Sequence, residues 1–324
     1  MMQIGLIGIG AGAASALLFA SVTSGSWLSA ILFYLAPLPV MIAGLGWSHW
    51  SALIAAFAGA TALALVFGGY FFFAYLAGPG LPAWWLGYLA LLARPAAQAS
   101  GNGGAPALEW YPPGQLVAWA TGLAAFAVCA AILYSATEAE TFQAHLHATV
   151  RQLLGLNADQ SGAVGKLANR KEIIDFLVEA IPPAAAVLST LTNVLNLWLG
   201  ARVVHFSGRL KRPWPALATM VFPRPLAAAL GLSIVLSFAP GLPGILAGVT
   251  AAALLMAFGI LGFAVLHAIT QAMPSRGFLL GGVYAAVLVF GWPVLPVCLV
   301  GLADMFFDLR GRIAARRGGP PAPA

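Results

Sequence analysis

Long apolar runs, separated by short polar turns, occupy most of the chain. The first five runs cover residues 3–21, 27–45, 50–67, 69–93 and 114–135. Each has close to the roughly 20 apolar residues that a helix needs to cross the hydrocarbon core of a bilayer. In lipid, every backbone polar group needs an internal partner, so only helices and closed barrels span a membrane. Barrel strands would alternate over short segments, so the continuous runs predict helices.

The second half of the chain continues this pattern less regularly. A sixth apolar run covers 184–204, and further runs cover 226–238, 243–268 and 278–303. The run at 226–238 is too short for a crossing and stops before a Pro-Gly-Leu-Pro turn. We expect this run to be re-entrant or tilted, or to merge with its neighbour. The sequence therefore predicts an all-α polytopic transmembrane bundle of about eight to nine helices.

Composition and charge agree with a membrane environment. Of the 324 residues, 61% are hydrophobic and only 7% are charged, whereas soluble domains carry about 25% charged residues. No charged residue falls in the middle of a predicted span, which argues against a proton relay or a voltage sensor. The net charge of +6 comes from loops and the C-terminal tail, so it fits membrane topology and not nucleic-acid binding.

The longest polar stretch, residues 136–180, separates two membrane halves. It contains an amphipathic helix that we expect to lie along the membrane surface. The apolar face of that helix consists of Phe142, Leu146, Val150, Leu153 and Leu154. The predicted divisions are an N-terminal five-helix half at 1–135, this polar stretch, a C-terminal half at 181–310 and a disordered cytoplasmic tail at 311–324.

The basic residues predict an orientation. The loop after the sixth run carries Arg202, Arg209, Lys211, Arg212 and Arg224 and no acid, so the positive-inside rule places it in the cytoplasm. Counting back over the crossings places the N-terminus and the turn at residue 94 inside and the stretch 136–180 outside. Arginines in the tail favour a cytoplasmic C-terminus as well. We expect a multi-pass protein of the bacterial inner membrane.

A stripe of small residues follows one face of the first span. Gly8, Gly12, Ala16 and Ala20 recur at every fourth position. Such a stripe lets another helix approach closely. The second helix could belong to this chain, which we favour, or to a membrane-protein partner.

Four polar residues share one face of the sixth span. Ser189, Thr192, Asn193 and Asn196 follow the spacing i, i+3, i+4, i+7 of a helix. One interpretation is that they form hydrogen bonds between helices. The other is that they line a cavity for a small polar solute.

The last span ends in a cluster of charged residues. Asp304, Asp308, Arg310 and Arg312 lie where this helix is expected to leave the membrane, and Asp308 and Arg312 have the i, i+4 spacing of a helical ion pair. We expect a solvated helix end, with docking of a cytoplasmic partner at Asp304, Asp308 and Arg310 as the alternative.

No catalytic or metal-binding pattern stands out. Cys129 and Cys298 lie inside apolar runs, where a thiol usually serves as a small packing group. His145 and His147 are two residues apart and point away from each other on a helix. The sequence therefore predicts no enzyme, no metal and no cofactor.

Three short stretches resemble a known family. They are Asn196–Arg202 (NLWLGAR), Gly262–His267 (GFAVLH) and Gly301–Arg310 (GLADMFFDLR). Together they resemble the YybS-like bacterial membrane proteins, a family of unknown function. That family is similar, at a distance, to the substrate-binding components of energy-coupling-factor vitamin transporters, whose first helix uses small residues to meet a transmembrane partner.

The resemblance implies that this protein binds or transports a small solute, and that the stripe of its first helix could meet a partner. The residues themselves leave a second function open, that of a non-transporting membrane scaffold or assembly factor.

Overall fold

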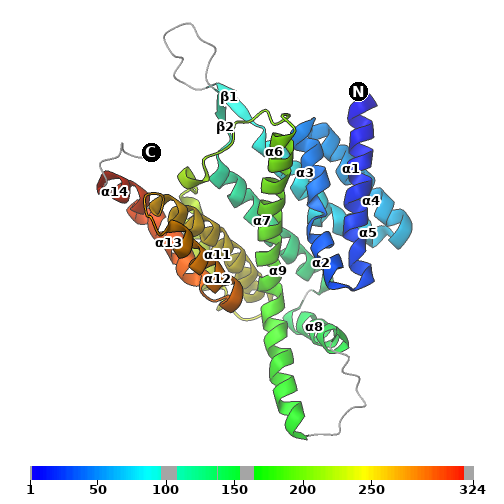
Figure 1. The fold of residues 1–324 in the computed structure, drawn as a ribbon. Helices are drawn as coiled ribbons and strands as arrows, with labels where there is room; N and C mark the ends of the chain where they lie inside the picture. Colours follow the sequence, from blue (N-terminus) through cyan, green and yellow to red (C-terminus); the bar gives the residue numbers. More distant parts are fainter. Residues whose placement is uncertain (1, 96–107, 137, 154–163, 317–324) are drawn as a thin grey trace, which may run out of the picture. The chain divides into compact units, whose positions relative to one another are not determined.

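The computed structural model describes residues 2–95, 108–136, 138–153 and 164–316 (Figure 1). These residues are almost entirely helical. The helices of the first half are α1 (Met2–Ala20), α2 (Trp27–Tyr34), α3 (Pro37–Gly46), α4 (His49–Phe67), α5 (Gly69–Tyr75), α6 (Leu81–Ala90), α7 (Pro113–Ser135) and α8 (Ala139–Leu153). Those of the second half are α9 (Val164–Phe206), α10 (Pro225–Leu236), α11 (Leu242–Ile269), α12 (Arg276–Phe290), α13 (Val294–Phe307) and α14 (Leu309–Arg316).

The predicted fold class, a polytopic helical bundle, is confirmed. Among the described residues, six helical stretches are long and apolar enough to cross a membrane: Met2–Ser24, Trp27–Gly46, His49–Phe67, Pro113–Ser135, Lys171–Phe206 and Leu242–Ile269. Helices α10, α12 and α13 are apolar but shorter. That α10 is re-entrant or tilted stays a prediction.

Several predicted boundaries differ from the structure. The run at 278–303 is divided into α12 and α13 by Gly291–Pro293, where Gly291 has a positive φ of 73° that suits a residue without a side chain. The sixth span is the C-terminal part of a 43-residue helix, α9, which continues through Pro182 and Pro183. Helix α14 covers the first part of the predicted disordered tail, and residues 317–324 lie outside the described residues.

The fourth predicted run, 69–93, is also divided. Its helices α5 and α6 are joined by a π-helical turn, Leu76–Gly80, in which Pro79 and Gly80 are buried. Two short antiparallel strands, β1 (Ala93–Pro95) and β2 (Leu108–Trp110), flank residues 96–107, which lie outside the described residues. Arg94 and Glu109 form an exposed ion pair across these strands, with 2.8 Å between Nε and Oε2.

The chain folds into two compact units. Unit 1 comprises Met1–Ala120, Leu191–Pro223 and Phe258–Ala324, and unit 2 comprises Thr121–Thr190 and Arg224–Ala257. Helices α7, α9 and α11 therefore contribute one part to each unit.

In unit 1, the small-residue stripe of α1 packs against α4. Both Gly8 and Gly12 touch α4, and a Cβ atom placed on Gly12 would lie 2.5 Å from the carbonyl oxygen of Ala55. Ala16 is buried in the same contact, and Ala20 packs at its edge. The stripe is therefore filled by a helix of the same chain and does not present a free face to a partner helix.

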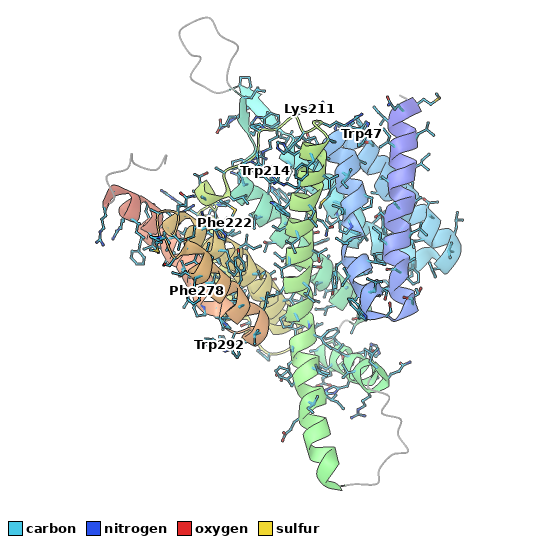
Figure 2. The ribbon with its side chains drawn as sticks, in the orientation of Figure 1. Trp47, Lys211, Trp214, Phe222, Phe278 and Trp292 are labelled. Carbon is cyan, nitrogen blue, oxygen red and sulfur yellow. The ribbon has the colours of Figure 1, made fainter. Side chains whose placement is uncertain are left out.

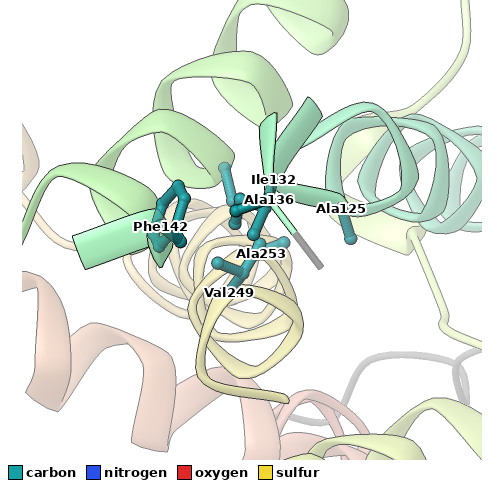
Figure 3. Packing of buried hydrophobic residues seen from close by; sticks show 7 residues of the cluster. Ala125, Ile132, Ala136, Phe142, Val249 and Ala253 are labelled. Atoms are coloured by element: carbon teal, nitrogen blue, oxygen red, sulfur yellow. The ribbon is translucent and has the colours of Figure 1, made fainter. Parts of the chain in front are cut away.

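In unit 2, the C-terminal half of α7 packs with α8 and the N-terminal half of α11 (Figure 3). Phe142 of α8 is buried together with Ile132 of α7 and Val249 of α11. Val150 of α8 packs against α9. The predicted amphipathic helix thus exists, and its apolar face contacts other helices of the chain. Leu153 is 80% exposed at the end of α8, and Leu154 lies outside the described residues.

Large apolar side chains cover much of the surface. Phe278, Leu288 and Phe238 are 89%, 84% and 85% exposed. So many large exposed apolar side chains are unusual for a soluble monomer. This is the surface expected of helices in contact with a lipid bilayer, which we take as the surroundings of the spanning segments.

Candidate functional site

The break between α2 and α3 in unit 1 exposes a backbone carbonyl inside the helical bundle. Pro37 and Pro39 lack an N–H, so neither can donate the usual helical hydrogen bond to the residue four positions back. The N–H of Leu38 bonds to the carbonyl of Leu35 at 3.0 Å, although a continuous α-helix would direct it to Tyr34. The Tyr34 carbonyl oxygen therefore loses its normal partner within the helix.

Asn196 of α9 supplies the missing hydrogen bond. Its side chain is only 2% exposed. The amide nitrogen Nδ2 donates to the Tyr34 carbonyl at 2.8 Å and to the Thr192 carbonyl at 2.8 Å. Since both neighbours are acceptors, the nitrogen of the amide must face them, and this fixes the orientation of the side chain.

The other atom of this amide is left without a partner. Asn196 Oδ1 is buried and accepts no hydrogen bond from any residue that the structure describes. An unsatisfied buried acceptor costs about 1–3 kcal/mol, so such groups are uncommon, and a bound water or ligand is one explanation for them. Here the acceptor lies beside a broken helix, a place where membrane transporters often bind their substrates.

The remaining residues of the predicted polar face have different surroundings. Asn193 is buried, and its Nδ2 donates to the Ala120 carbonyl of α7 at 3.3 Å. Thr192 is half-buried and contributes its backbone carbonyl to Asn196. Ser189 is half-buried as well. The structure thus brings the Asn196 amide to the break, while Asn193 joins α9 to α7.

Two further polar residues at the break were not predicted. Ser15 of α1 donates its hydroxyl to the carbonyl of Ala36, and Tyr75 of α5 donates to Ser15 Oγ at 2.6 Å. Gly59 of α4 leaves space for the phenol, because a Cβ atom there would lie 2.7 Å from the Tyr75 hydroxyl oxygen. The only sequence signals were indirect: Ser15 adjoins the small-residue stripe, and Tyr75 precedes the Gly/Pro turn.

The charged cluster at the end of α13 forms an internal ion pair. The Asp304 carboxylate receives Nε and NH2 of Arg310 at 2.9 and 2.7 Å and the backbone N–H of Arg310 at 3.1 Å. Arg310 also donates to the carbonyl of Ala218 at 2.6 Å. Because Asp304 is 5% exposed, the prediction of a solvated helix end is wrong for this pair.

The reason for this difference is the backbone at Asp308. This residue ends α13 in the left-handed conformation, with φ 46°, and brings Arg310 back toward Asp304. Its carboxylate accepts the N–H of Gly311 at 3.0 Å, and the expected pair with Arg312 does not occur among the described residues. Partner docking at Asp304, Asp308 and Arg310 stays a prediction.

The residues considered for metal binding are dispersed. Within the described part of the chain, no group of three or more His, Cys, Asp or Glu residues could hold a metal ion. His147 lies 3.7 Å from the Asp175 carboxylate in unit 2. The Cys129 thiol approaches the carbonyl of Leu246 at 3.8 Å.

Comparison with protein families identifies the chain. The model of a family described as predicted membrane protein (DUF2232) matches residues 13–305. The chain belongs to the DUF2232 family. The match covers the break, the polar face of α9 and the Asp304 carboxylate, and it ends before Arg310. No curated protein and no solved structure matches the chain.

Proposed function

We propose that this DUF2232 protein binds a small polar solute inside its membrane bundle, at the break between α2 and α3. The similarity to YybS-like proteins and to transporter substrate-binding components suggested this function from the sequence. The observation that carries the proposal is the buried, unpartnered Oδ1 of Asn196 beside a discontinuous helix.

The same geometry indicates the chemistry of the solute. The Asn196 amide nitrogen donates to two carbonyls, so only the amide oxygen Oδ1 is available for a further hydrogen bond, as an acceptor. An acceptor selects a solute with an O–H or N–H donor. No Asp, Glu, Lys or Arg is within α1 to α6, so recognition would rest on hydrogen bonds and shape.

A scaffold or assembly role is the alternative, and the contacts of the other polar residues favour it. Asn193, Ser15 and Tyr75 donate all of their described side-chain hydrogen bonds to atoms of the chain itself. Such bonds between membrane helices contribute about 0.6 kcal/mol on average and serve packing alone.

Substitution of Asn196 separates these two functions. Small molecules that copurify with the wild-type protein would be identified by mass spectrometry and compared with those from Asn196→Leu and Asn193→Leu. We expect the amount of at least one copurified polar solute to fall about tenfold in Asn196→Leu, as expected when a hydrogen bond worth about 1.4 kcal/mol is lost, and to change little in Asn193→Leu, because the Asn193 amide contacts α7 and not the break.

Ser233→Ala provides the control. Ser233 is also buried in an apolar helix, but its hydroxyl bonds within that helix to Ala229. This variant should retain the solute. Identical extracts from folded wild type and folded Asn196→Leu would contradict solute binding, and loss of folding in Asn196→Leu would support the packing role.

We further propose that the protein lies in the bacterial inner membrane with both termini in the cytoplasm. Support comes from unit 1, where the basic segment after α9 meets the end of α6: Arg212 donates to the carbonyl of Ala90 at 3.2 Å. The turn at Arg94 and the basic loop therefore share one end of this unit, as the positive-inside rule requires if both are cytoplasmic.

This orientation can be tested with single cysteines in a background that carries Cys129→Ala and Cys298→Ala. A membrane-impermeant maleimide should label Glu140→Cys in intact spheroplasts, since α8 is predicted to lie outside. Lys211→Cys should react only after lysis. Labelling of Lys211→Cys in intact spheroplasts would reverse the proposed topology.

A further inference from the structure

The basic segment that follows α9 folds over the ends of α3 and α6 in unit 1. The Arg209 guanidinium lies 4.6 Å from the centre of the Trp47 ring, and Arg212 donates to the carbonyl of Ala90. Figure 2 shows Lys211 and Trp47 near this end of α9. Positive charge and aromatic rings thus meet at one end of the unit.

Arg212 is buried without a carboxylate. It is 9% exposed, and its only described hydrogen bond joins NH1 to the Ala90 carbonyl at 3.2 Å. A guanidinium has five N–H donors, so most of them have no acceptor in the described part of the chain. The ion pairs described in unit 1 join other arginines to Glu109 and Asp304.

Among the described residues no carboxylate pairs with Arg212, and its remaining guanidinium nitrogens are not among the fully buried atoms, so they are accessible at the surface. Burial lowers the pKa of Arg212, because removal from water disfavours its charged form. Nevertheless, arginine keeps its proton in proteins. A buried cation is stable only when an anion and further hydrogen bonds replace its hydration.

Three tryptophans, Trp84 and Trp85 in α6 and Trp47 at the end of α3, have buried indole N–H groups without a partner among the described residues. Trp85 packs in one apolar cluster with Ala90 and with Leu210 of the basic segment. An indole N–H can only donate, so these tryptophans add hydrogen-bond donors to α6 and to the end of α3.

We propose that Arg212 binds a phosphate-bearing anion at this end of unit 1. A phosphate offers several acceptor oxygens and matches the planar fork of an arginine, which can hold it through two hydrogen bonds. Its charge would compensate the buried guanidinium. The anion could be a phospholipid headgroup, which basic pockets between membrane helices bind, or a soluble phosphate. The proposal does not depend on the solute site at the α2–α3 break.

The test uses the full-length protein purified in a neutral detergent. Thermal unfolding would be followed while dioleoyl-phosphatidylglycerol, dioleoyl-phosphatidylcholine or inorganic phosphate is added. We expect phosphatidylglycerol or inorganic phosphate to raise the Tm of the wild type. A shift with phosphatidylglycerol alone assigns the site to a lipid headgroup, and a shift with inorganic phosphate assigns it to a soluble phosphate.

Arg212→Gln and Lys211→Gln form a matched pair, because both remove one positive charge at adjacent positions and Lys211 is exposed. The apparent affinity should fall about tenfold in Arg212→Gln, as expected for loss of a charge-assisted hydrogen bond, and change little in Lys211→Gln. Arg212→Lys keeps the charge but loses the planar fork, so it should also bind more weakly and serves if Arg212→Gln does not fold. Equal losses in the Lys211 and Arg212 variants, or no Tm shift in the wild type, would overturn the proposal.

Discussion

Replacement of Asp304 by asparagine is expected to reduce the free energy of unfolding by about 3–5 kcal/mol, the cost of removing one partner from a buried ion pair. The Asp304 and Arg310 side chains are 3% and 14% exposed, and Asp304 accepts three hydrogen bonds from Arg310. An asparagine of the same shape would leave the guanidinium with no compensating charge in a poorly hydrated place. Titration of the purified protein with SDS in mixed micelles measures this free energy.

Asp308→Asn is the matched control, since it makes the same chemical change four residues away. The Asp308 carboxylate is exposed and accepts one backbone N–H, from Gly311. Asparagine also caps helices and tolerates the left-handed backbone conformation of this position, so stability should change by less than about 1 kcal/mol. The double variant, Asp304→Asn with Arg310→Gln, should lose less stability than the sum of the losses measured for the two single variants, because the two residues interact directly. An equal loss of stability in Asp304→Asn and Asp308→Asn would show that the Asp304–Arg310 ion pair does not stabilise the end of α13.

The helical fold followed from the sequence because lipid imposes a simple rule on the backbone. Long apolar runs with charges at their ends must form helices, and most of the predicted runs are helices in the structure. The boundaries that differed depend on local backbone chemistry. Gly291 and Pro293 divide one predicted span, whereas Pro182 and Pro183 lie inside a continuous helix. Residue identity did not distinguish these cases, since proline is tolerated in membrane helices when neighbours satisfy the freed carbonyls.

Only part of the candidate site could be predicted from the sequence. Helical spacing singled out Asn196 as one of four polar residues on a face of α9, and its amide contacts the break. Its partner is the backbone carbonyl of Tyr34, and a carbonyl has no sequence signature. Ser15 and Tyr75 meet although they are 60 residues apart, a pairing that tertiary packing decides. The Asp304–Arg310 pair likewise depends on the reversal of the chain at Asp308.

The close contact of α11 and α13 in unit 1 yields the second large effect. Gly262 and Gly301 come from two of the stretches that carried the family resemblance. A Cβ atom on Gly262 would collide with the backbone carbonyl of Val297, and one on Gly301 would collide with that of Phe258. A backbone carbonyl cannot rotate away as a flexible side chain can, so the two helices must separate to admit a larger residue.

Gly262→Leu is therefore expected to lower the free energy of unfolding by about 3 kcal/mol or more, at the upper end of the range for overpacking. Gly301→Leu should act in the same way, and both would be measured by the SDS titration used for Asp304. Gly282→Leu in α12 is the control, because nothing lies within 4 Å of a Cβ atom at that position. The free energy of unfolding of this control should equal that of the wild type or increase slightly, since leucine forms helices better than glycine. If Gly262→Leu and Gly282→Leu were equally stable, the helices could not be packed as closely as the glycines indicate.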